Sequence, residues 1–507
     1  MIISLSVLVI TIIVSGTYAL YKAQLSKNIG VNTTTHGLAY YINYVKGTDI
    51  TAATLNPSTS YEGGVSSDIE FWKKDDSYDI YGKIELTVNT IGTNLSNSPA
   101  LKYAVVNNGN VLKEGSLKGT TSGSKVTILK NLYLEQTKQI YTVYVWLDNS
   151  EELGNISNES LSISVDCTAS LQKEPTAADT IISLYTSAAK VTATNNSITY
   201  NTAPSVSLMN DRLGGTTTSL DGGNIRYYGA SPNNYIYFNC SDYSNQTSST
   251  CETWRIIGVF DGKLKLIRGS QIGKYSWDNK NTSTGAENNS GKNDWTTARL
   301  MKLLNPRDYY KVDSNDNNLG QSLYYNSASG KCYSGQNNAT VDCDFTSTGI
   351  KNDETRNMIA ETTYYLGGWN SYSVYPNEIY EYERGTTVYT GRPPTWPGKI
   401  ALAYPSDYGY AADLNQCKDK TLYDYDNSTC TSNNWMKAIL GTSSHGWLLT
   451  PRSGGSYNAW NVYSGGYVGS TYLAYYAIGA VPVLSLSSKL GIESGDGSSS
   501  NPYKLSA

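Results

Sequence analysis

The sequence predicts a multidomain protein with an N-terminal apolar helix, an all-β sandwich and a large α+β domain. Three observations predict this order: an uncharged apolar start, a run of alternating β-branched segments, and a long remainder rich in Gly, Trp and Cys. The chain has 507 residues, enough for several hydrophobic cores. We expect a signal or transmembrane segment at 1–21, the sandwich at 22–168, a linker with a short helix at 169–196 and the α+β domain at 197–507.

The first 21 residues contain no charged side chain. In a helix they would span roughly 32 Å, enough to cross a bilayer. Small residues at Thr17-Tyr18-Ala19 fit the cleavage site of a signal peptide equally well. Because no Lys or Arg precedes Lys22, the flanking charge does not orient the segment. We expect an extracellular chain at the cell surface, anchored in the membrane by this helix, and leave its cleavage open.

The charge balance and the histidine count exclude several classes of function. The chain has 39 Lys and Arg against 43 Asp and Glu, so it lacks the basic footprint of a nucleic-acid-binding protein. The two histidines, His36 and His445, leave little for metal ligation or acid–base catalysis. The 44 Tyr against 4 Phe indicate amphipathic rings that face water and ligands. We expect no cofactor, no metal site, no catalytic residue and no nucleic-acid partner.

Six segments between residues 38 and 166 are rich in β-branched residues and Tyr. In one of them Val143, Val145 and Leu147 alternate with Thr142, Tyr144 and Trp146, which is the period of a strand. Turn residues separate the segments, and this spacing is typical of a β-sandwich. The predicted strands are residues 38–45, 80–91, 101–107, 125–135, 139–147 and 160–166.

A domain boundary is predicted in the polar stretch 168–178, which contains Pro175. Apolar residues then predict a short helix over 177–190. From about residue 197 the chain changes to loops, glycines and tryptophans, and Asp261-Gly262 is a hairpin signal. The predicted elements there are strands at 235–239, 254–260 and 263–268 and helices at 295–304, 353–366 and 434–440.

Six of the seven cysteines form neighbouring pairs separated by 11, 11 and 13 positions. Short loops of this kind predict three local disulfides, which agree with export. Zinc is the competing explanation, but the pairs lack CxxC spacing and a nearby His. The seventh, Cys167, is expected to be free or buried at a domain edge. The predicted pairs are Cys240–Cys251, Cys332–Cys343 and Cys417–Cys430.

Candidate binding residues concentrate in residues 446–486. Between framework residues such as Trp447 and Trp460, twelve positions are nearly all Tyr, Ser, Gly or small aliphatic. This composition is typical of an antibody-like binding surface, where rigid Tyr rings supply contact area and small residues adapt. A structural Gly/Tyr-rich edge ribbon is the alternative. The expected ligand-binding residues are Ser453, Ser456, Tyr457, Tyr463, Tyr467, Gly469, Ser470, Tyr472, Leu473, Tyr475, Tyr476 and Ile478.

The frame of this segment resembles a known family. It reads Trp-Leu-Leu-Thr-Pro-Arg-Ser at 447–453, Ala-Trp-Asn-Val at 459–462 and Val-Pro-Val-Leu at 481–484. It is similar to the C-type lectin-like variable proteins of diversity-generating retroelements, and to the related formylglycine-generating-enzyme-like domains of bacterial surface proteins. The resemblance covers roughly 200–507 and includes Met209-Asn210-Asp211 and the stretch 404–409. In the retroelement family, adenine mutagenesis converts Asn codons, and the twelve positions carry residues reachable from them.

The resemblance implies a diversified ligand-binding surface on a C-type lectin-like scaffold. We therefore expect a bacterial cell-surface adhesion or display protein, whose partner is a protein or glycan on another cell, a phage or a host surface. Catalytic relatives rely on a reactive cysteine pair, whereas the C-terminal cysteines here are assigned to local disulfides. We expect no enzyme, and an enzyme of the formylglycine-generating type stays as an alternative.

The N-terminal part carries a second resemblance. Residues 16–21 and 141–148 are similar to exported β-sandwich proteins of the camelysin and biofilm-fibre type, over about 22–167. This resemblance implies display or polymerisation of the sandwich at the cell surface. A structural subunit of a surface filament is therefore another alternative, and an ordinary spacer domain fits equally well.

Overall fold

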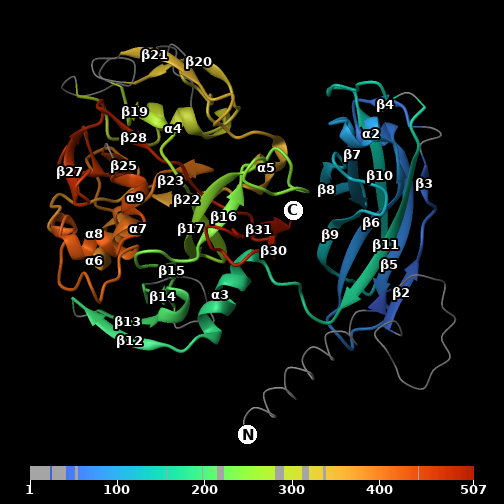
Figure 1. Cartoon of the computed structure of the whole chain (residues 1–507), viewed down its shortest axis with the longest axis horizontal. Helices are drawn as coiled ribbons and strands as arrows, with labels where there is room; N and C mark the ends of the chain where they lie inside the picture. Colours follow the sequence, from blue (N-terminus) through green and yellow to red (C-terminus); the bar gives the residue numbers. More distant parts are fainter. Residues whose placement is uncertain are drawn as a thin grey trace, which may run out of the picture. The chain divides into compact units, whose positions relative to one another are not determined.

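The computed structural model describes residues 23–24, 41–51, 55–156, 158–196, 198–213, 222–279, 290–310, 319–334, 339–442 and 445–506. The apolar segment expected at 1–21 lies outside these residues. Within the described ranges, no helix is both long and apolar enough to cross a membrane. The chain divides into two compact units, Met1–Glu174 and Pro175–Ala507 (Figure 1).

The first unit is a β-sandwich built from two mainly antiparallel sheets, in which the short pair β4–β10 is parallel. In its described residues one sheet has the order β1-β11-β6-β9, and β3 also pairs with β11. The other has the order β2-β5-β10-β7-β8, and β4 pairs with β10. The strands are β1 (Ala23–Gln24), β2 (Ile42–Val45), β3 (Ile50–Thr51), β4 (Pro57–Ser58), β5 (Val65–Lys73), β6 (Tyr81–Ile91), β7 (Leu101–Asn107), β8 (Asn110–Ser116), β9 (Lys125–Tyr133), β10 (Ile140–Asp148) and β11 (Leu161–Ser170), with one short helix, α2 (Thr93–Asn97).

Alternation along the strands builds the core of this sandwich. On β6, Ile84, Leu86 and Val88 are buried while the residues between them are partly exposed. The alternation predicted for β10 is present, because Val143 and Val145 are buried in the same core. Side chains of period two from both sheets thus meet between them.

Two long strands of the sandwich, β5 and β8, have no counterpart among the predicted segments, and neither do the two-residue strands β1, β3 and β4. The buried face of β5 includes Ser67 and Lys73, so its polarity does not alternate in the sequence. The Lys73 ammonium donates to the Tyr133 hydroxyl at 2.8 Å and pairs with Asp76 at 2.7 Å. Strand β8 lies at the sheet edge and has no buried residue, so it shows no apolar face.

Cys167 is both free and buried. It lies on β11 and belongs to the core of the sandwich. Burial raises the pKa of its thiol well above the usual value. The side chain therefore acts as a small apolar core residue.

The structure differs from the predicted linker at 169–196. Strand β11 continues to Ser170 within the sandwich, and the boundary between the units follows Glu174. The predicted short helix is present as α3 (Ala177–Ser187), but its Ile181 and Tyr185 are buried in the core of the second unit. The residues after it form β12 (Val191–Asn195), which opens the large sheet of that unit.

Two sheets organise the second unit (Figure 1). In the described residues the larger has the order β12-β13-β14-β15-β17-β18-β29-β24, with β16 also paired to β17. The smaller has the order β19-β28-β25-β26-β27. Further two-stranded pairs are β20–β21, β22–β23 and β30–β31. The bounds are β13 (Ile198–Ala203), β14 (Leu208–Asn210), β15 (Ile225–Tyr227), β16 (Tyr235–Phe238), β17 (Glu252–Phe260), β18 (Lys263–Arg268), β19 (Gly273–Ser276), β20 (Ser329–Tyr333), β21 (Thr340–Asp344), β22 (Thr362–Tyr365), β23 (Thr395–Gly398), β24 (Ile400–Ala401), β25 (Gly446–Pro451), β26 (Asn458–Val462), β27 (Val468–Leu473), β28 (Ala477–Ala480), β29 (Val483–Ser485), β30 (Gly491–Ser494) and β31 (Lys504–Ser506).

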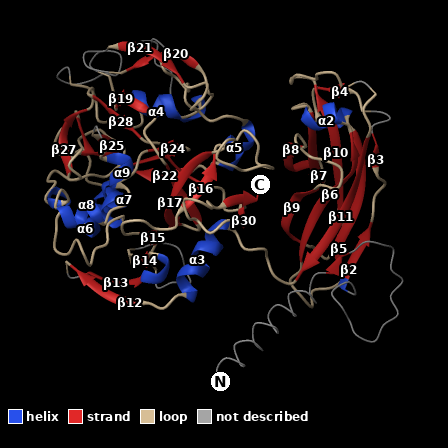
Figure 2. Ribbon diagram, in the orientation of Figure 1, coloured by secondary structure: helices blue, strands red, loops and turns tan. Residues whose placement is uncertain are grey.

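Short helices connect these strands (Figure 2). The three predicted helices are present but shorter, as α4 (Arg299–Leu304), α5 (Asp353–Met358) and α9 (Lys437–Leu440). The second was predicted to reach residue 366, but residues 362–365 form strand β22, which pairs with β23. Tyr364 on this strand and Leu366 just after it are both buried in the core.

Three further helices lie outside the predicted set: α6 (Pro376–Arg384), α7 (Pro405–Tyr410) and α8 (Ser428–Ser432). Helices α6 and α7 each begin with Pro, and an acidic side chain two residues later bonds back to the residue before that Pro. These are recognisable start signals, which the loop-like composition around them obscured.

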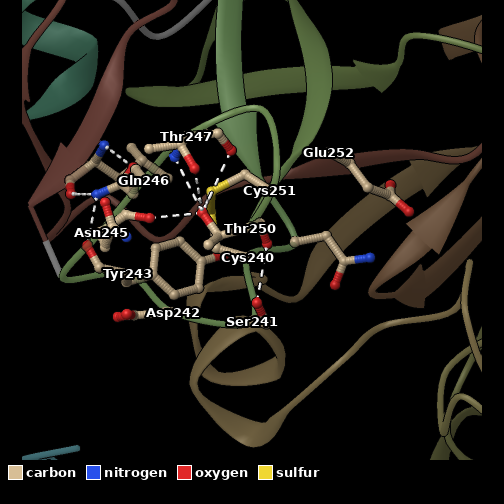
Figure 3. The surroundings of a disulfide bond; sticks show 12 residues. Cys240, Ser241, Asp242, Tyr243, Asn245, Gln246, Thr247, Thr250, Cys251 and Glu252 are labelled. Carbon is tan, nitrogen blue, oxygen red and sulfur yellow. Dashed lines mark hydrogen bonds between the residues drawn. A yellow bond between two sulfur atoms is a disulfide. The ribbon is translucent and has the colours of Figure 1, made fainter. Parts of the chain in front are cut away.

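All three predicted disulfides, Cys240–Cys251, Cys332–Cys343 and Cys417–Cys430, are present. The first closes a loop that hydrogen bonds hold in shape (Figure 3). Within that loop, the Thr250 hydroxyl donates to the carbonyl of Asn245 at 2.5 Å. The Gln246 amide donates to the carbonyl of Leu505 at 2.7 Å and accepts from its N–H at 2.9 Å, so the loop is tied to β31.

Candidate ligand-binding site

Within the described residues, 446–480 supply four of the five strands of the smaller sheet, and the residues that follow form β29 of the larger sheet. Trp447 on β25 and Trp460 on β26 are fully buried, as expected of framework residues. They belong to different hydrophobic clusters. Trp447 lies opposite Asn461, the neighbour of Trp460 on β26. Because neighbouring residues of a strand point to opposite faces, the two tryptophans anchor the two faces of this sheet.

The structure buries four of the twelve residues expected to bind ligand and leaves eight partly exposed. Ser456, Gly469, Ser470 and Ile478 are buried, so in this structure they are part of the scaffold rather than of the surface. The partly exposed residues are Ser453, Tyr457, Tyr463, Tyr467, Tyr472, Leu473, Tyr475 and Tyr476. Composition predicted the segment, but composition cannot distinguish the two faces of its strands, which only the fold separates.

Seven tyrosine rings form a continuous surface feature, which we call the aromatic stripe. Successive ring centroids are 4.2–5.6 Å apart, within the range of favourable aromatic contacts. Every ring in it is partly or largely exposed. In order along the stripe, the residues are Tyr372, Tyr423, Tyr467, Tyr463, Tyr472, Tyr476 and Tyr475.

The centre of the stripe is built by the turn between β26 and β27. The Tyr463 N–H donates to the carbonyl of Tyr467 at 2.9 Å, and the Gly466 N–H donates to the carbonyl of Tyr463 at 2.8 Å. Gly466 has a φ of +104°, a backbone conformation that other residues rarely adopt. This turn stacks the rings of Tyr463 and Tyr467 with their planes 14° apart.

Gly469 has a positional role in the stripe. A Cβ atom at this residue would lie 2.5 Å from Cε2 of Tyr463. The Tyr463 ring therefore occupies the space that a side chain on β27 would fill. Gly469 acts on the surface through Tyr463 rather than by facing a ligand.

Tyr372 and Tyr423 belong to the stripe, although neither was among the residues predicted to bind ligand. Tyr423 is 47% exposed and lies in a 3-10 turn (Leu422–Asp424) inside the loop closed by Cys417–Cys430. Its ring is 5.6 Å from that of Tyr467 and 4.7 Å from that of Tyr372. A tyrosine within a short disulfide loop was a usable signal for Tyr423. No local signal marked Tyr372.

His445 lies beside the stripe, although no ligand-binding role was predicted for it. Its ring centroid is 4.5 Å from that of Tyr463 and 5.0 Å from that of Tyr472. Its Nδ1 accepts a hydrogen bond from the Ser464 N–H at 3.0 Å. Desolvation lowers the pKa of His445, so the imidazole is neutral at neutral pH.

The segment 446–486 carries little charge, whereas the exposed Asp424 and Asp426 lie beside the stripe in the loop closed by Cys417–Cys430. Arg452 is the one charged residue between positions 446 and 486, and its Nε donates to Asn370 at 2.7 Å. Desolvation raises the pKa of Tyr467, Tyr472 and Tyr475, so their hydroxyls stay protonated and can donate hydrogen bonds. The stripe offers ring faces and neutral hydroxyls.

A buried ionic cluster supports the same unit. Arg226 contacts Asp211 at 2.5 Å and Asp407 at 3.2 Å, and Lys265 contacts Asp407 at 2.5 Å. All four side chains are buried. Asp211 and Asp407 come from two of the motifs that carry the family resemblance, and the fold brings them onto one arginine. Since the cluster does not reach the surface, it positions backbone segments rather than a ligand.

Metal-ligating side chains do not gather in the part of the chain that the structure describes. There, no group of three or more His, Cys, Asp or Glu is placed to hold a metal ion. All six cysteines of the second unit are disulfide-bonded.

Comparisons with known sequences found no match, and those with solved structures include a weak one. No family model matches the sequence, and no curated protein matches it. Among solved structures, the chain is similar to an acetyl xylan esterase (Est2A) from the rumen bacterium Butyrivibrio proteoclasticus, with 12% sequence identity and a TM-score of 0.15. The match covers 31% of this chain and 34% of the esterase chain, so it spans about a third of each. At this TM-score it carries no argument about fold or activity.

Proposed function

We propose that this chain is a bacterial cell-surface adhesion or display protein whose second unit binds a ligand through the aromatic stripe. The observation that carries the proposal is the stripe itself, seven neighbouring Tyr rings on one scaffold that are partly or largely exposed. Tyr supplies contact area at low entropic cost and is enriched where proteins bind partners. The second unit is proposed to be a C-type lectin-like domain, on the motifs at 447–453, 459–462 and 481–484.

Extracellular placement is supported by the disulfides. Three local disulfides in one unit are typical of an oxidising compartment. The proposed membrane anchor is the apolar segment at 1–21. The partner is proposed to be a protein or a glycan on another cell, a phage or a host surface.

The test replaces Tyr467, Tyr472, Tyr475 and Tyr476 with Ala in the full-length chain. The chain is coupled to beads and presented to immobilised oligosaccharides and to bacterial and animal cells. We expect the wild type to bind at least one of these probes. The variant should bind at least about tenfold less of it, because the loss of each ring reduces the contact area. Thermal stability should stay close to that of the wild type.

A matched control is Tyr78→Ala, which removes an exposed ring from the first unit. This variant should bind as the wild type does. Equal binding by the fourfold variant and the wild type would refute the proposed role of the stripe. A large loss of thermal stability in the fourfold variant would mean that these rings are structural.

Diversification of the surface is a separate part of the proposal. It requires an adenine-rich near-copy of the DNA for residues 446–486 and a reverse-transcriptase gene near the coding sequence. Sequencing of the locus in several strains should show substitutions concentrated at the Tyr, Ser and Gly positions. Variation spread evenly over the second unit would argue against diversification.

A second candidate function is a structural subunit of a surface filament. The observation that favours it is the edge strand β8, where Val111 and Leu112 are exposed. A sheet edge presents unpaired backbone groups that can pair with another copy. Electron microscopy of the full-length chain would show fibres, and their loss on Val111→Lys would support pairing through β8.

We propose no enzymatic activity. An enzyme of the formylglycine-generating type needs a reactive thiol pair, and the six cysteines of the second unit are paired locally. Thiol titration of the native chain should find no accessible thiol, since Cys167 is buried.

A further inference from the structure

The side chain of Asn461 lies beneath the middle of the aromatic stripe. On β26, Asn461 is opposite Trp447 of β25 and Gly469 of β27. Residues directly opposite in antiparallel strands share a face of the sheet. Since the Tyr463 ring fills the space at Gly469, Asn461 lies between Trp447 and the residue that this ring covers.

Neither the oxygen nor the nitrogen of this amide has a hydrogen-bonding partner among the described residues. The side chain is 0% exposed. A buried amide normally has both atoms bonded, because leaving them unpaired is costly. By contrast, Asn458 on the same strand donates to the carbonyl of Thr471 at 2.8 Å.

Four aromatic rings gather on this face of the sheet. Tyr472 is 6.4 Å from Trp447 and 5.3 Å from Tyr463, and His445 contacts both tyrosines. Trp447 is fully buried, whereas Tyr463 is partly exposed and its hydroxyl lies 3.2 Å from the Thr471 hydroxyl at the surface. Tyr463 is therefore the ring that can turn outward and uncover Asn461.

We propose that Asn461 is the polar anchor of a subsite for a neutral oligosaccharide. This inference rests on the proposed function of the stripe and names the ligand class. An amide offers a donor and an acceptor, which matches a sugar hydroxyl that is also both. Ring faces suit the C–H faces of a pyranose, and these four rings carry no charge, so neutral sugars are favoured over acidic ones.

The decisive variant is Asn461→Leu, which has nearly the same shape and no polar atoms. If the amide were structural, this change would break its hydrogen bonds and lower the melting temperature. The Asn461 amide makes no hydrogen bond to the described residues, so the melting temperature of the Asn461→Leu protein should not fall. Binding of the full-length chain to immobilised neutral hexasaccharides of glucose, xylose, mannose and N-acetylglucosamine should fall at least about tenfold. Asn458→Leu is the matched control, which should lower the melting temperature because it breaks the bond to Thr471.

The possible results separate this inference from the proposed function. The subsite would be supported if the wild type bound neutral hexasaccharides and Asn461→Leu did not. Unchanged retention by that variant, or a lower melting temperature, would overturn it. Binding only to acidic hexasaccharides or only to cell-surface proteins, lost in the fourfold Tyr variant, would overturn the subsite and leave the proposed function standing. Binding that survives the fourfold variant would overturn both.

Discussion

The ring of Tyr463 lies flat on the ring of Tyr467, with centroids 4.2 Å apart, and both belong to one short turn. The turn gives this pair its geometry, and Tyr423 and Tyr472 extend the contact on either side. A stripe assembled from one turn and its neighbours depends on the small residues that shape the turn. This dependence on small residues can be tested without knowing the ligand.

Gly469→Ala should move the Tyr463 ring with little loss of stability. The new Cβ would lie 2.5 Å from the outer edge of that ring, which is partly exposed and can give way. We expect a change in the near-ultraviolet circular dichroism of coupled tyrosines and a stability loss below about 1 kcal/mol.

Gly466→Ala is the matched comparison in the same turn. There the backbone has a φ of +104°, and a Cβ would lie 2.7 Å from Thr431 and 3.3 Å from the carbonyl of Tyr425. We expect a loss of about 1–3 kcal/mol in chemical denaturation. Equal effects of the two changes would contradict the positional role assigned to Gly469.

Removal of the Cys417–Cys430 disulfide should weaken both stability and binding. The double variant Cys417→Ser, Cys430→Ser should lose about 3 kcal/mol, as a loop of this length predicts. It should also lose ligand, because Tyr423 is held against Tyr467 by that loop. Urea denaturation and bead retention measure the two effects.

The equivalent change at Cys332 and Cys343 provides the control. That disulfide joins β20 and β21, which carry no ring of the stripe. A similar loss of stability with unchanged binding is expected. If both double variants bound the ligand equally well, the binding role assigned to Tyr423 would be wrong.

Glu383 should make folding stability fall as pH rises. It is buried, and desolvation raises its pKa from 4.5 to about 7, although Ser406 donates to it from its N–H at 2.9 Å and its hydroxyl at 2.5 Å. The folded state then holds this proton more tightly than the unfolded state. The associated stability is fully present below about pH 4.5 and is lost as pH rises through about 7, by on the order of 3 kcal/mol.

The measurement is urea denaturation at several pH values between 4.5 and 8 for the wild type and Glu383→Gln. The variant should show a flatter profile, because Gln does not titrate. The Ser406 hydroxyl can rotate to accept from the new amide. Identical slopes for the two proteins would contradict the assignment.

Asp407→Asn should be strongly destabilising. Asp407 accepts from Lys265 at 2.5 Å and from Arg226 at 3.2 Å, and it also caps α7 through the Tyr404 N–H at 2.9 Å. Removing its charge leaves two buried cations with less compensation, which costs about 3–5 kcal/mol. Asp426→Asn, an exposed change in the loop beside the stripe, should alter the free energy of unfolding, measured by urea denaturation, by less than about 0.5 kcal/mol.

Much of the scaffold was predictable from local patterns. The spacing of the cysteines predicted three disulfides that the structure contains, and the alternation around Val143 and Val145 predicted a strand of the sandwich. Strand β5 was not predictable, because Lys73 occupies an inward position and is satisfied there by Tyr133 from another strand. Helix α3 was predictable as a helix, but its membership of the second unit depends on packing partners far along the chain.

The candidate site shows the same division. Residue composition and cysteine spacing act over a few positions, so the sequence alone was enough to identify a Tyr-rich segment at 446–486 and the loop at 417–430. Which Tyr rings face outward depends on the register of β25, β26 and β27, and the meeting of Tyr372, Tyr423 and His445 with that segment depends on tertiary packing. The unpartnered amide of Asn461 is of the same kind, since a side chain has partners or lacks them only after distant strands have been brought together.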